Sequence, residues 1–329
     1  MSIAAKADQA SPAGSASPLS KRRPFGDRSF QVLCLAAGLL VLIILALIAI
    51  SMTQQSATWF TTAGWSGVFS TNWDPAHNSF GALPFIYGTL ITAAIAIVIA
   101  FPVSVGIALL LTEVVPRRFA RQIVYVIDLL AVVPSVVWGL WGFLVLAPWL
   151  QPIYQSIASG LTGVPVLGTF FGGTSVSGTS FFTTGLILAI MITPIVTSLS
   201  REVIATVPTI DREGAYALGA TRWEMIRGAV WPHSQAGVVG AVLLGLGRAM
   251  GETIAAALVI GSSATITTHL FNPGYSMPSV IANEFGEATV GEFRSALIGM
   301  GVLLFVLTII INLSARAIVD RSARRARGA

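Results

Sequence analysis

The stretch that decides the fold runs from Glu213 to Thr253 and reads EGAYALGATRWEMIRGAVWPHSQAGVVGAVLLGLGRAMGET. Its first half, up to Trp231, is polar, charged and rich in helix-forming residues. We expect Pro232 to end this polar segment, because proline has no backbone N–H to donate, and an apolar helix follows at once. Arg248 and Glu252 then lie deep inside the apolar helix. A helix that faces water therefore leads directly into an apolar helix that carries two charged residues in its interior.

The composition indicates an integral membrane protein. Of the 329 residues, 54% are hydrophobic and only 10% are charged, whereas soluble domains carry about 25% charged residues. The single cysteine, Cys34, cannot form an internal disulfide, and the three histidines are scattered, so the sequence predicts no metal site. No nucleophile–base set is visible, and we assign no catalytic residues.

Six apolar runs are long enough to cross the hydrocarbon core of a bilayer, which takes about 20 helical residues. We predict an all-α, polytopic membrane protein with a transmembrane domain at 30–318 and a polar loop at 201–233. Residues 1–29 form a basic tail that we expect to be disordered, and 319–329 form a second basic tail. The predicted spans are 30–51, 83–111, 122–147, 181–200, 234–262 and 294–318.

Basic residues define the expected orientation of these spans. Of the 19 Lys and Arg residues, all but Arg248 and Arg294 fall in the N-terminal tail or in 117–121, 201–227 and 316–327, which alternate along the chain. The opposite loops contain none. This is the positive-inside pattern, so we expect both termini and the 201–233 loop to be cytoplasmic. The same distribution argues against binding of nucleic acid, because the basic residues mark topology.

Arg248 and Glu252 are the main candidates for a functional site within the membrane. Arg248 lies 14 residues into the fifth predicted span, about 21 Å along a helix, where an arginine costs roughly 3 kcal/mol. Glu252 is four positions further on, so the two side chains share a helix face, and their pairing offsets part of this cost. The pair either fixes helix packing or lines a substrate path, in which the guanidinium presents several donors to an oxyanion. We favour the path.

Three further polar residues in the predicted spans are candidates for the same path. Asp128 lies in the third span, where pairing or snorkelling towards water is the alternative. Ser135 follows Pro134 and Thr193 precedes Pro194, so a broken helix there would expose backbone donors to an anion. For both residues the alternative is that they accommodate a kink.

The stretch quoted above contains a signature that resembles that of a known family. Glu213, Ala215, Gly219 and Pro232 follow the EAA signature of ABC-importer permeases, with Gly214, Ala229 and Trp231 departing from it. Two further resemblances are more specific. Phosphate (Pst) importers have segments similar to EGAYALGATRWEMIRGAVWP and the GRAMGET that follows it. Their PstC permeases have segments similar to FPVSVGIALLLTEVVPRR and LLAVVPSVVWGLWG. The resemblance covers about 89–253, and the rest more loosely.

The resemblance implies a type I, MetI-like bundle with a cytoplasmic EAA-type coupling loop. It implies that Glu213, Gly214, Ala215, Gly219 and Pro232 belong to a segment that docks on a separate ATPase. A homologous permease (PstA-like), an ATPase dimer (PstB-like) and an extracytoplasmic phosphate-binding protein (PstS-like) are the implied partners. From the residues alone, a helix hairpin lying on the inner leaflet is the alternative for this amphipathic loop.

The chain is not expected to be an enzyme. Its only lysines, Lys6 and Lys21, lie in the N-terminal tail, so no phosphate-binding P-loop is present. We expect the chain to bind no cofactor, and ATP and Mg²⁺ to be used by the partner ATPase. The sequence thus predicts a permease subunit of an ATP-driven phosphate importer. The alternatives are a permease for another oxyanion such as sulfate or molybdate, an ATP-independent secondary transporter or channel, and a non-transporting membrane scaffold.

Overall fold

The computed structural model describes residues 25–161, 163–173, 175–288 and 291–327. It divides into two units, 1–50 and 51–329. The first unit consists, in its described part, of most of helix α1 (Phe25–Thr62), a long apolar helix. The N-terminal tail predicted for residues 1–29 lies almost wholly outside the described residues.

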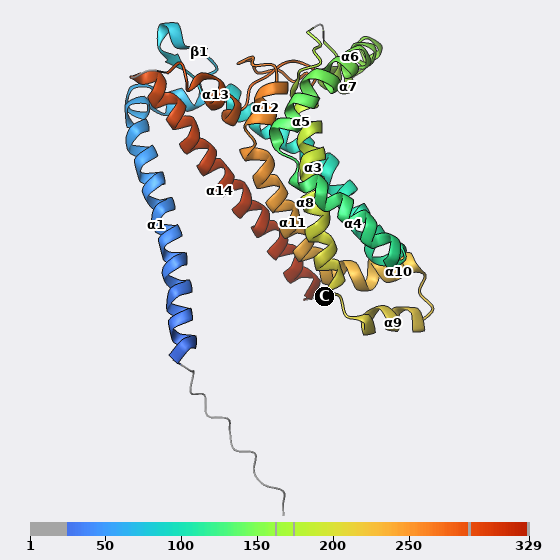
Figure 1. The fold of residues 1–329 in the computed structure, drawn as a ribbon. Helices are drawn as coiled ribbons and strands as arrows, with labels where there is room; N and C mark the ends of the chain where they lie inside the picture. The colour runs from blue at the N-terminus through green and yellow to red at the C-terminus, as the bar shows by residue number, and fades with distance from the viewer. Residues whose placement is uncertain (1–24, 162, 174, 289–290, 328–329) are drawn as a thin grey trace, which may run out of the picture. The chain divides into compact units, whose positions relative to one another are not determined.

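The second unit is helical apart from one short hairpin, so the predicted all-α class is confirmed (Figure 1). Its elements in chain order are α2 (Gly64–Phe69), β1 (Trp73–Asp74), η1 (Pro75–His77), β2 (Ser79–Phe80), α3 (Leu83–Leu109), η2 (Leu110–Val114), α4 (Arg117–Val132), α5 (Ser135–Trp141), η3 (Gly142–Leu146), α6 (Ala147–Leu161), α7 (Leu167–Phe171), α8 (Phe181–Ala205), α9 (Thr209–Ala217), α10 (Arg222–Met225), η4 (Ile226–Val230), α11 (Trp231–Gly251), α12 (Ile254–Val259), α13 (Met277–Glu284) and α14 (Glu292–Arg327). The segments η2, η3 and η4 are single π-helical turns.

Six helical segments of the described chain are long and apolar enough to span a membrane. Four of them lie within about five residues of the predicted bounds, and two differ by more. The third predicted span is divided by Pro134 between α4 and α5, and the apolar helical segment that qualifies runs over 135–161. The fifth begins earlier and ends earlier than expected, covering 222–251. Pro102 lies inside α3, which continues to Leu109.

Pro232 does not end the polar segment, contrary to the prediction. It occupies the first turn of α11, where a missing N–H removes no intrahelical hydrogen bond. The chain is therefore helical without a break from Arg222 to Gly251, and the π turn η4 lies between the polar and apolar parts.

Helices α3, α8 and α11 form the centre of the second unit. Small residues allow the three backbones to approach closely, and Ala96, Ala189 and Ala249 are buried where the helices meet. At Gly185 of α8, a Cβ atom would lie 2.5 Å from the side chain of Ile95 on α3. Such packing of small residues is the usual way in which membrane helices associate.

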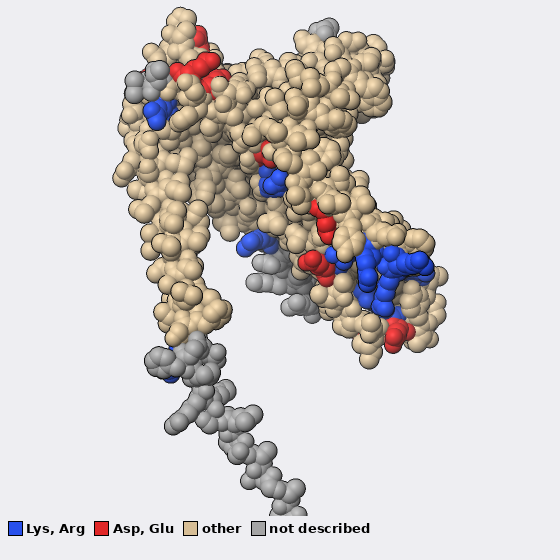
Figure 2. All heavy atoms as spheres, viewed as in Figure 1, with Lys and Arg blue, Asp and Glu red and all other residues tan. Residues whose placement is uncertain are grey.

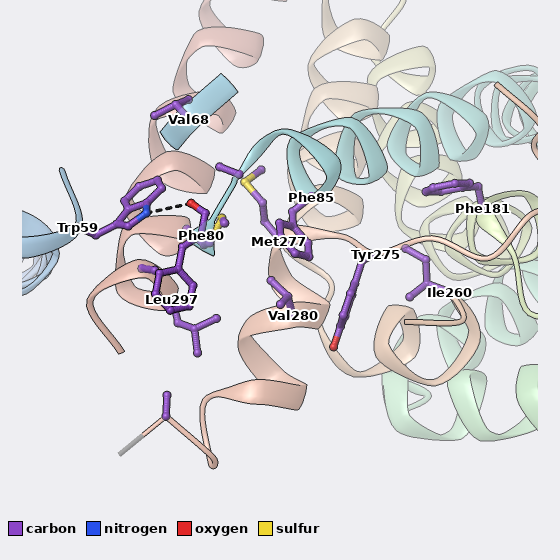
Figure 3. Close-up of a cluster of buried hydrophobic side chains, with 14 residues drawn as sticks. Trp59, Val68, Phe80, Phe85, Phe181, Ile260, Tyr275, Met277, Val280 and Leu297 are labelled. Atoms are coloured by element: carbon purple, nitrogen blue, oxygen red, sulfur yellow. Dashed lines mark hydrogen bonds between the residues drawn. The ribbon is translucent and has the colours of Figure 1, made fainter. Parts of the chain in front are cut away.

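An aromatic cluster closes the end of this unit that carries α13 (Figure 3). Trp59 is 1% exposed; its indole N–H donates to the carbonyl of Phe80 (3.0 Å), and its backbone N–H donates to the hydroxyl of Ser295 (3.0 Å). Nearby, the Trp73 indole N–H donates to the carboxylate of Glu284 (3.0 Å). Burial raises the pKa of Glu284, against the lowering effect of this hydrogen bond.

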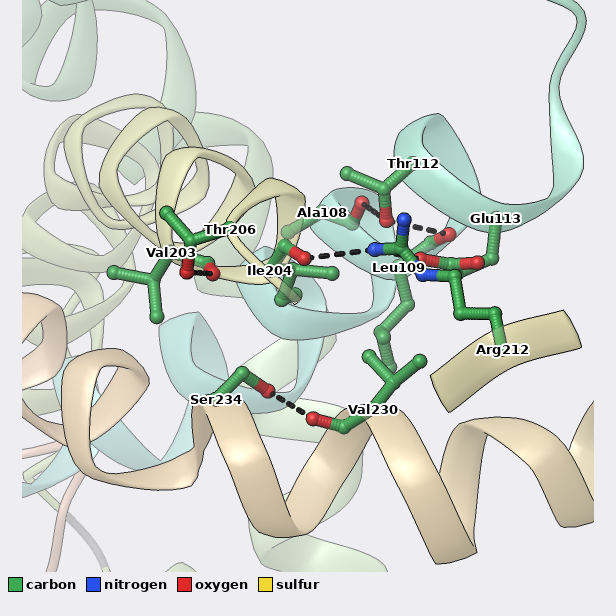
Figure 4. A network of polar contacts seen from close by, with 10 residues as sticks. All are labelled: Ala108, Leu109, Thr112, Glu113, Val203, Ile204, Thr206, Arg212, Val230 and Ser234. Carbon is green, nitrogen blue, oxygen red and sulfur yellow. Dashed lines mark hydrogen bonds and ion pairs between the residues drawn. The ribbon is translucent and has the colours of Figure 1, made fainter. Parts of the chain in front are cut away.

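A buried ion pair attaches α9 to the opposite end of the unit (Figure 4). Arg212 of α9 lies 3.1 Å from the carboxylate of Glu113, whose side chain is 6% exposed, and it donates to the carbonyl of Ile204 (2.9 Å). One guanidinium thus joins α9, the turn that follows α3 and the last residues of α8. The core beneath it includes Ala108, Val207 and Val230.

Replacing Glu113 with Gln should destabilise the fold. The substitution leaves the guanidinium of Arg212 largely buried without its counter-charge, which costs about 3 kcal/mol or more in comparable pairs. Thermal unfolding of the detergent-purified chain measures the effect, with Glu202→Gln on the exposed surface of α8 as the control for loss of a carboxylate. Equal unfolding midpoints for the two variants would contradict a structural role for the pair.

Candidate functional site

The charged residues of the fifth predicted span lie where α11 ends. Arg248 is in the last turn of α11, and the helix stops at Gly251 because Glu252 has extended backbone angles (φ −70°, ψ 121°). The Glu252 side chain does not turn back along α11. One of its carboxylate oxygens accepts a hydrogen bond from the backbone N–H of Ala255, 3.4 Å away, in the first turn of α12. The carboxylate therefore sits where a helix start favours negative charge.

The predicted pairing of Arg248 with Glu252 is therefore wrong in its geometry. It assumed a continuous helix, on which residues four apart share a face. In the described part of the chain, the only ion pairs within 4.0 Å are Asp74–His77 and Glu113–Arg212. Arg248 is exposed and keeps its guanidinium without a carboxylate at ion-pair distance among those residues.

Both charged residues nevertheless line one groove. This groove has a volume of about 530 Å³ and is bounded by α8, α11 and α14. Ile195 contributes from α8, Leu244 and Gly247 from α11, and Asn312 from α14. Arg248 lines the groove from the last turn of α11, and Glu252 lines it from the residue at which that helix ends.

The other path candidates lie outside the groove. The Thr193 hydroxyl donates to the Ala189 carbonyl of its own helix (2.7 Å), as expected of a residue that accommodates a proline kink. Asp128 lies on the exposed face of α4 and accepts from Ser198 of α8 (3.4 Å). Ser135 is half-buried at the start of α5. None of the three lines the groove.

The residues of the EAA-like segment form a turn between two short helices. Glu213, Gly214 and Ala215 lie on α9, and Gly219 has φ +84°, a conformation that glycine adopts without strain. Thr221 and Glu224 then form a reciprocal capping box at the start of α10. The segment is therefore a helix–turn–helix with its turn at Gly219.

The same segment exposes large apolar side chains. Leu218 is 91% exposed, Ile210 73% and Trp223 67%. Glu213 is also exposed, whereas the neighbouring Arg212 is held by Glu113 and Ile204. Exposed apolar groups on a polar surface mark a site of interaction with protein or lipid.

Charged side chains gather at the two ends of the second unit (Figure 2). Acidic groups lie at the end with β1 and α13, while most basic groups lie near the start of α4 and around α10. The face between the two ends is mostly uncharged in this view, apart from a few basic and acidic groups midway.

The sequence analysis missed the residues that hold α9 in place. Glu113 and Arg212 are 99 positions apart in the sequence, and neither lies within a predicted span. A carboxylate directly after an apolar run was the available signal for Glu113. Asn312 of α14, which lines the groove, was also missed, because a single amide in an apolar run has no distinctive spacing.

Comparison with known proteins identifies the family. The family model described as binding-protein-dependent transport system inner membrane component matches residues 104–328. The phosphate transport system permease protein PstC of Mesorhizobium japonicum is 43% identical over 92% of this chain and 92% of its own, and that of Haemophilus influenzae is 45% identical over 86% and 90%. A permease PstC 2 of Mycobacterium tuberculosis is 42% identical over 89% and 91%.

Solved structures support the same fold. A chain of a bacterial alginate ABC transporter superposes with a TM-score of 0.61 at 16% identity, covering 92% of this chain and 98% of that one. A chain of the MetNI methionine ABC transporter gives a TM-score of 0.52 at 15% identity, covering 73% and 94%. The expected MetI-like bundle is thus confirmed, and the chain belongs to the family of binding-protein-dependent transport system inner membrane components, in the group that contains the PstC permeases.

Proposed function

We propose that this chain is a permease subunit of an ATP-driven importer of inorganic phosphate. The observation that carries the proposal is the guanidinium of Arg248, which lines an open groove beside spanning helices with no carboxylate at ion-pair distance among the described residues. A charge in such a place is costly unless it faces a cavity or a ligand. Arginine presents several N–H donors in a planar array that suits a phosphate oxyanion and keeps its charge.

The substrate assignment draws on the relatives. The PstC proteins cited above carry phosphate transport in their names and match nearly the whole chain. The groove by itself accommodates any small tetrahedral oxyanion. Uptake of radiolabelled phosphate by the reconstituted complex, with arsenate and sulfate as competitors, tests the choice. Phosphate import inhibited by arsenate supports it, and stronger inhibition by sulfate would overturn it.

Glu252 gives the site a second charge without neutralising the first. Its carboxylate is held at the start of α12, so Arg248 stays available to a ligand. The negative charge nearby limits how tightly an anion is retained. Weak and reversible binding is what a transport path requires.

We infer where the partners bind from the two ends of the second unit. The end with α9 and α10 faces the cytoplasm in this proposal, by the positive-inside rule, as do both termini. An ATPase dimer docks there against Ile210, Leu218 and Trp223, with Glu213 facing a basic group. A homologous permease completes the groove, and an extracytoplasmic phosphate-binding protein delivers substrate at the α13 end. ATP and Mg²⁺ belong to the ATPase.

The chain's own part in the cycle is mechanical and electrostatic. Movement of α9 by the ATPase passes through Arg212 to the turn after α3 and to the end of α8. Helix α8 also borders the groove through Ile195. Displacement of α9 would therefore alter the access of phosphate to Arg248.

Arg248→Gln should abolish phosphate uptake while the complex still assembles, because glutamine keeps hydrogen-bonding groups but not the positive charge. Arg248→Lys, which keeps the charge and loses the planar donor array, should retain partial uptake. Initial rates in proteoliposomes containing ATP measure both variants. Uptake by Arg248→Gln at the wild-type rate would show that Arg248 serves only the packing of the helices.

Leu218→Ser should weaken binding of the ATPase by about 10- to 150-fold, since burying a leucine side chain contributes about 1.5–3 kcal/mol. The matched control is Leu167→Ser on α7, where another exposed leucine lies outside the proposed docking surface. Titration of the purified ATPase against the permease complex gives both affinities. A similar loss in the two variants would argue against docking at α9 and α10.

A further inference from the structure

A second groove continues from the one at Arg248. It has a volume of about 480 Å³ and lies between α11 and α14. Leu243, Leu244 and Asn312 line both grooves, so the two are contiguous. The second extends along α11 as far as Ala236, which is 12 residues, or about 18 Å, before Arg248 on the helix.

The wall of this second groove is almost entirely uncharged. Among the described residues that line it, the only polar side chains belong to Asn312 and Arg316, one turn apart on α14. The others are alanine, valine, leucine and glycine. The Asn312 amide faces α11 closely: a Cβ atom on Gly247 would lie 4.0 Å from its nitrogen. The absence of a side chain at Gly247 thus leaves room for this amide beside Arg248.

An anion that leaves Arg248 along this wall would meet unfavourable surroundings. Moving a charged group past apolar groups costs several kcal/mol unless donors replace its lost hydration. Asn312 lies at the junction of the grooves, and Arg316 lies towards the end that carries α9 and α10. These are the two side chains on the wall that can supply N–H donors to an oxyanion.

We propose that Asn312 and Arg316 form a second oxyanion site, which receives phosphate from Arg248 and releases it on the cytoplasmic side. The inference rests on the proposed function for the direction of transport. Phosphate would first contact Arg248 beside Glu252, pass the amide of Asn312 and reach Arg316. Two cationic sites joined by a neutral donor divide one long apolar crossing into shorter steps, and each site holds the anion weakly enough to release it.

The alternative for Arg316 is a topological role, since a basic residue at the end of a spanning helix also anchors that helix at the cytoplasmic surface. The two roles differ in what the residue contacts. An anchoring arginine acts through lipid headgroups and is replaceable, whereas a path residue faces the moving anion. The position of Arg316 on the wall of the groove, in line with Asn312, favours the path.

The test measures initial rates of radiolabelled phosphate uptake by the reconstituted complex, together with ATP hydrolysis. Arg316→Gln should lower uptake roughly 10-fold, the effect of losing a hydrogen bond to a charged group, and Arg316→Lys should recover part of it. Asn312→Asp, which places a negative charge at the junction, should lower uptake more than Asn312→Leu does. The matched control is Arg117→Gln, an exposed arginine at the start of α4 that does not line either groove.

Several outcomes would overturn the inference. Uptake by Arg316→Gln equal to that of Arg117→Gln would assign Arg316 an anchoring role. Loss of ATP hydrolysis together with uptake would show that Arg316 acts in coupling ATP hydrolysis to transport and not in binding the anion. The wild-type complex serves as the separate test of the proposed function: if it imports another oxyanion and not phosphate, that proposal fails, and the same variants measured with the imported anion decide the role of Arg316.

Discussion

The ion pair between Arg212 and Glu113 is the interaction on which the placement of α9 depends. Three segments far apart in the sequence meet at one guanidinium: α9, the π turn after α3, and the end of α8. A buried carboxylate left without a partner is strongly unfavourable, so α9 cannot detach from the bundle at low cost. Its apolar outer face therefore remains presented to a partner in a fixed direction.

Two of the π turns in the chain lie close to this ion pair. One, η2, contains Glu113, and the other, η4, precedes α11 and contributes Val230 to the core beneath Arg212. A π turn inserts an extra residue into a helix and is less regular than the α-helical turns around it. The α-helical rods α3 and α11 thus join the α9–α10 segment through their least regular turns. Any displacement of that segment would be absorbed or passed on there.

The outline of the fold could be predicted from the sequence because it depends on local properties. Apolar runs of sufficient length predict six spans, and six helical segments of the described chain are long and apolar enough to cross a membrane. The break after Gly251 could not be predicted in this way. Nothing in the spacing of Arg248 and Glu252 indicates that the helix ends between them, and the interpretation as a pair relied on its continuing.

Polarity within an apolar run does not locate the groove, for a related physical reason. Ser135, Thr193 and Asp128 were selected for their polarity within apolar runs, but a hydroxyl in a membrane helix can satisfy itself on its own backbone, as Thr193 does with Ala189. Glu113 and Arg212, and likewise Asn312 and Arg248, are brought together only by packing. Their relation depends on which helices are neighbours, and a single sequence does not record that.

The end of α11 at Gly251 has a consequence for how charge is managed in the groove. Had the helix continued, Glu252 would have neutralised Arg248, and an incoming anion would have had to displace a covalently tethered carboxylate at high local concentration. Because the chain turns at Glu252, the carboxylate is stabilised instead by a backbone N–H at the start of α12. The cost of keeping the two charges apart is thus offset by local backbone structure. In this arrangement Arg248 binds an anion without first breaking an ion pair, and the negative charge of Glu252 weakens the retention of the bound anion.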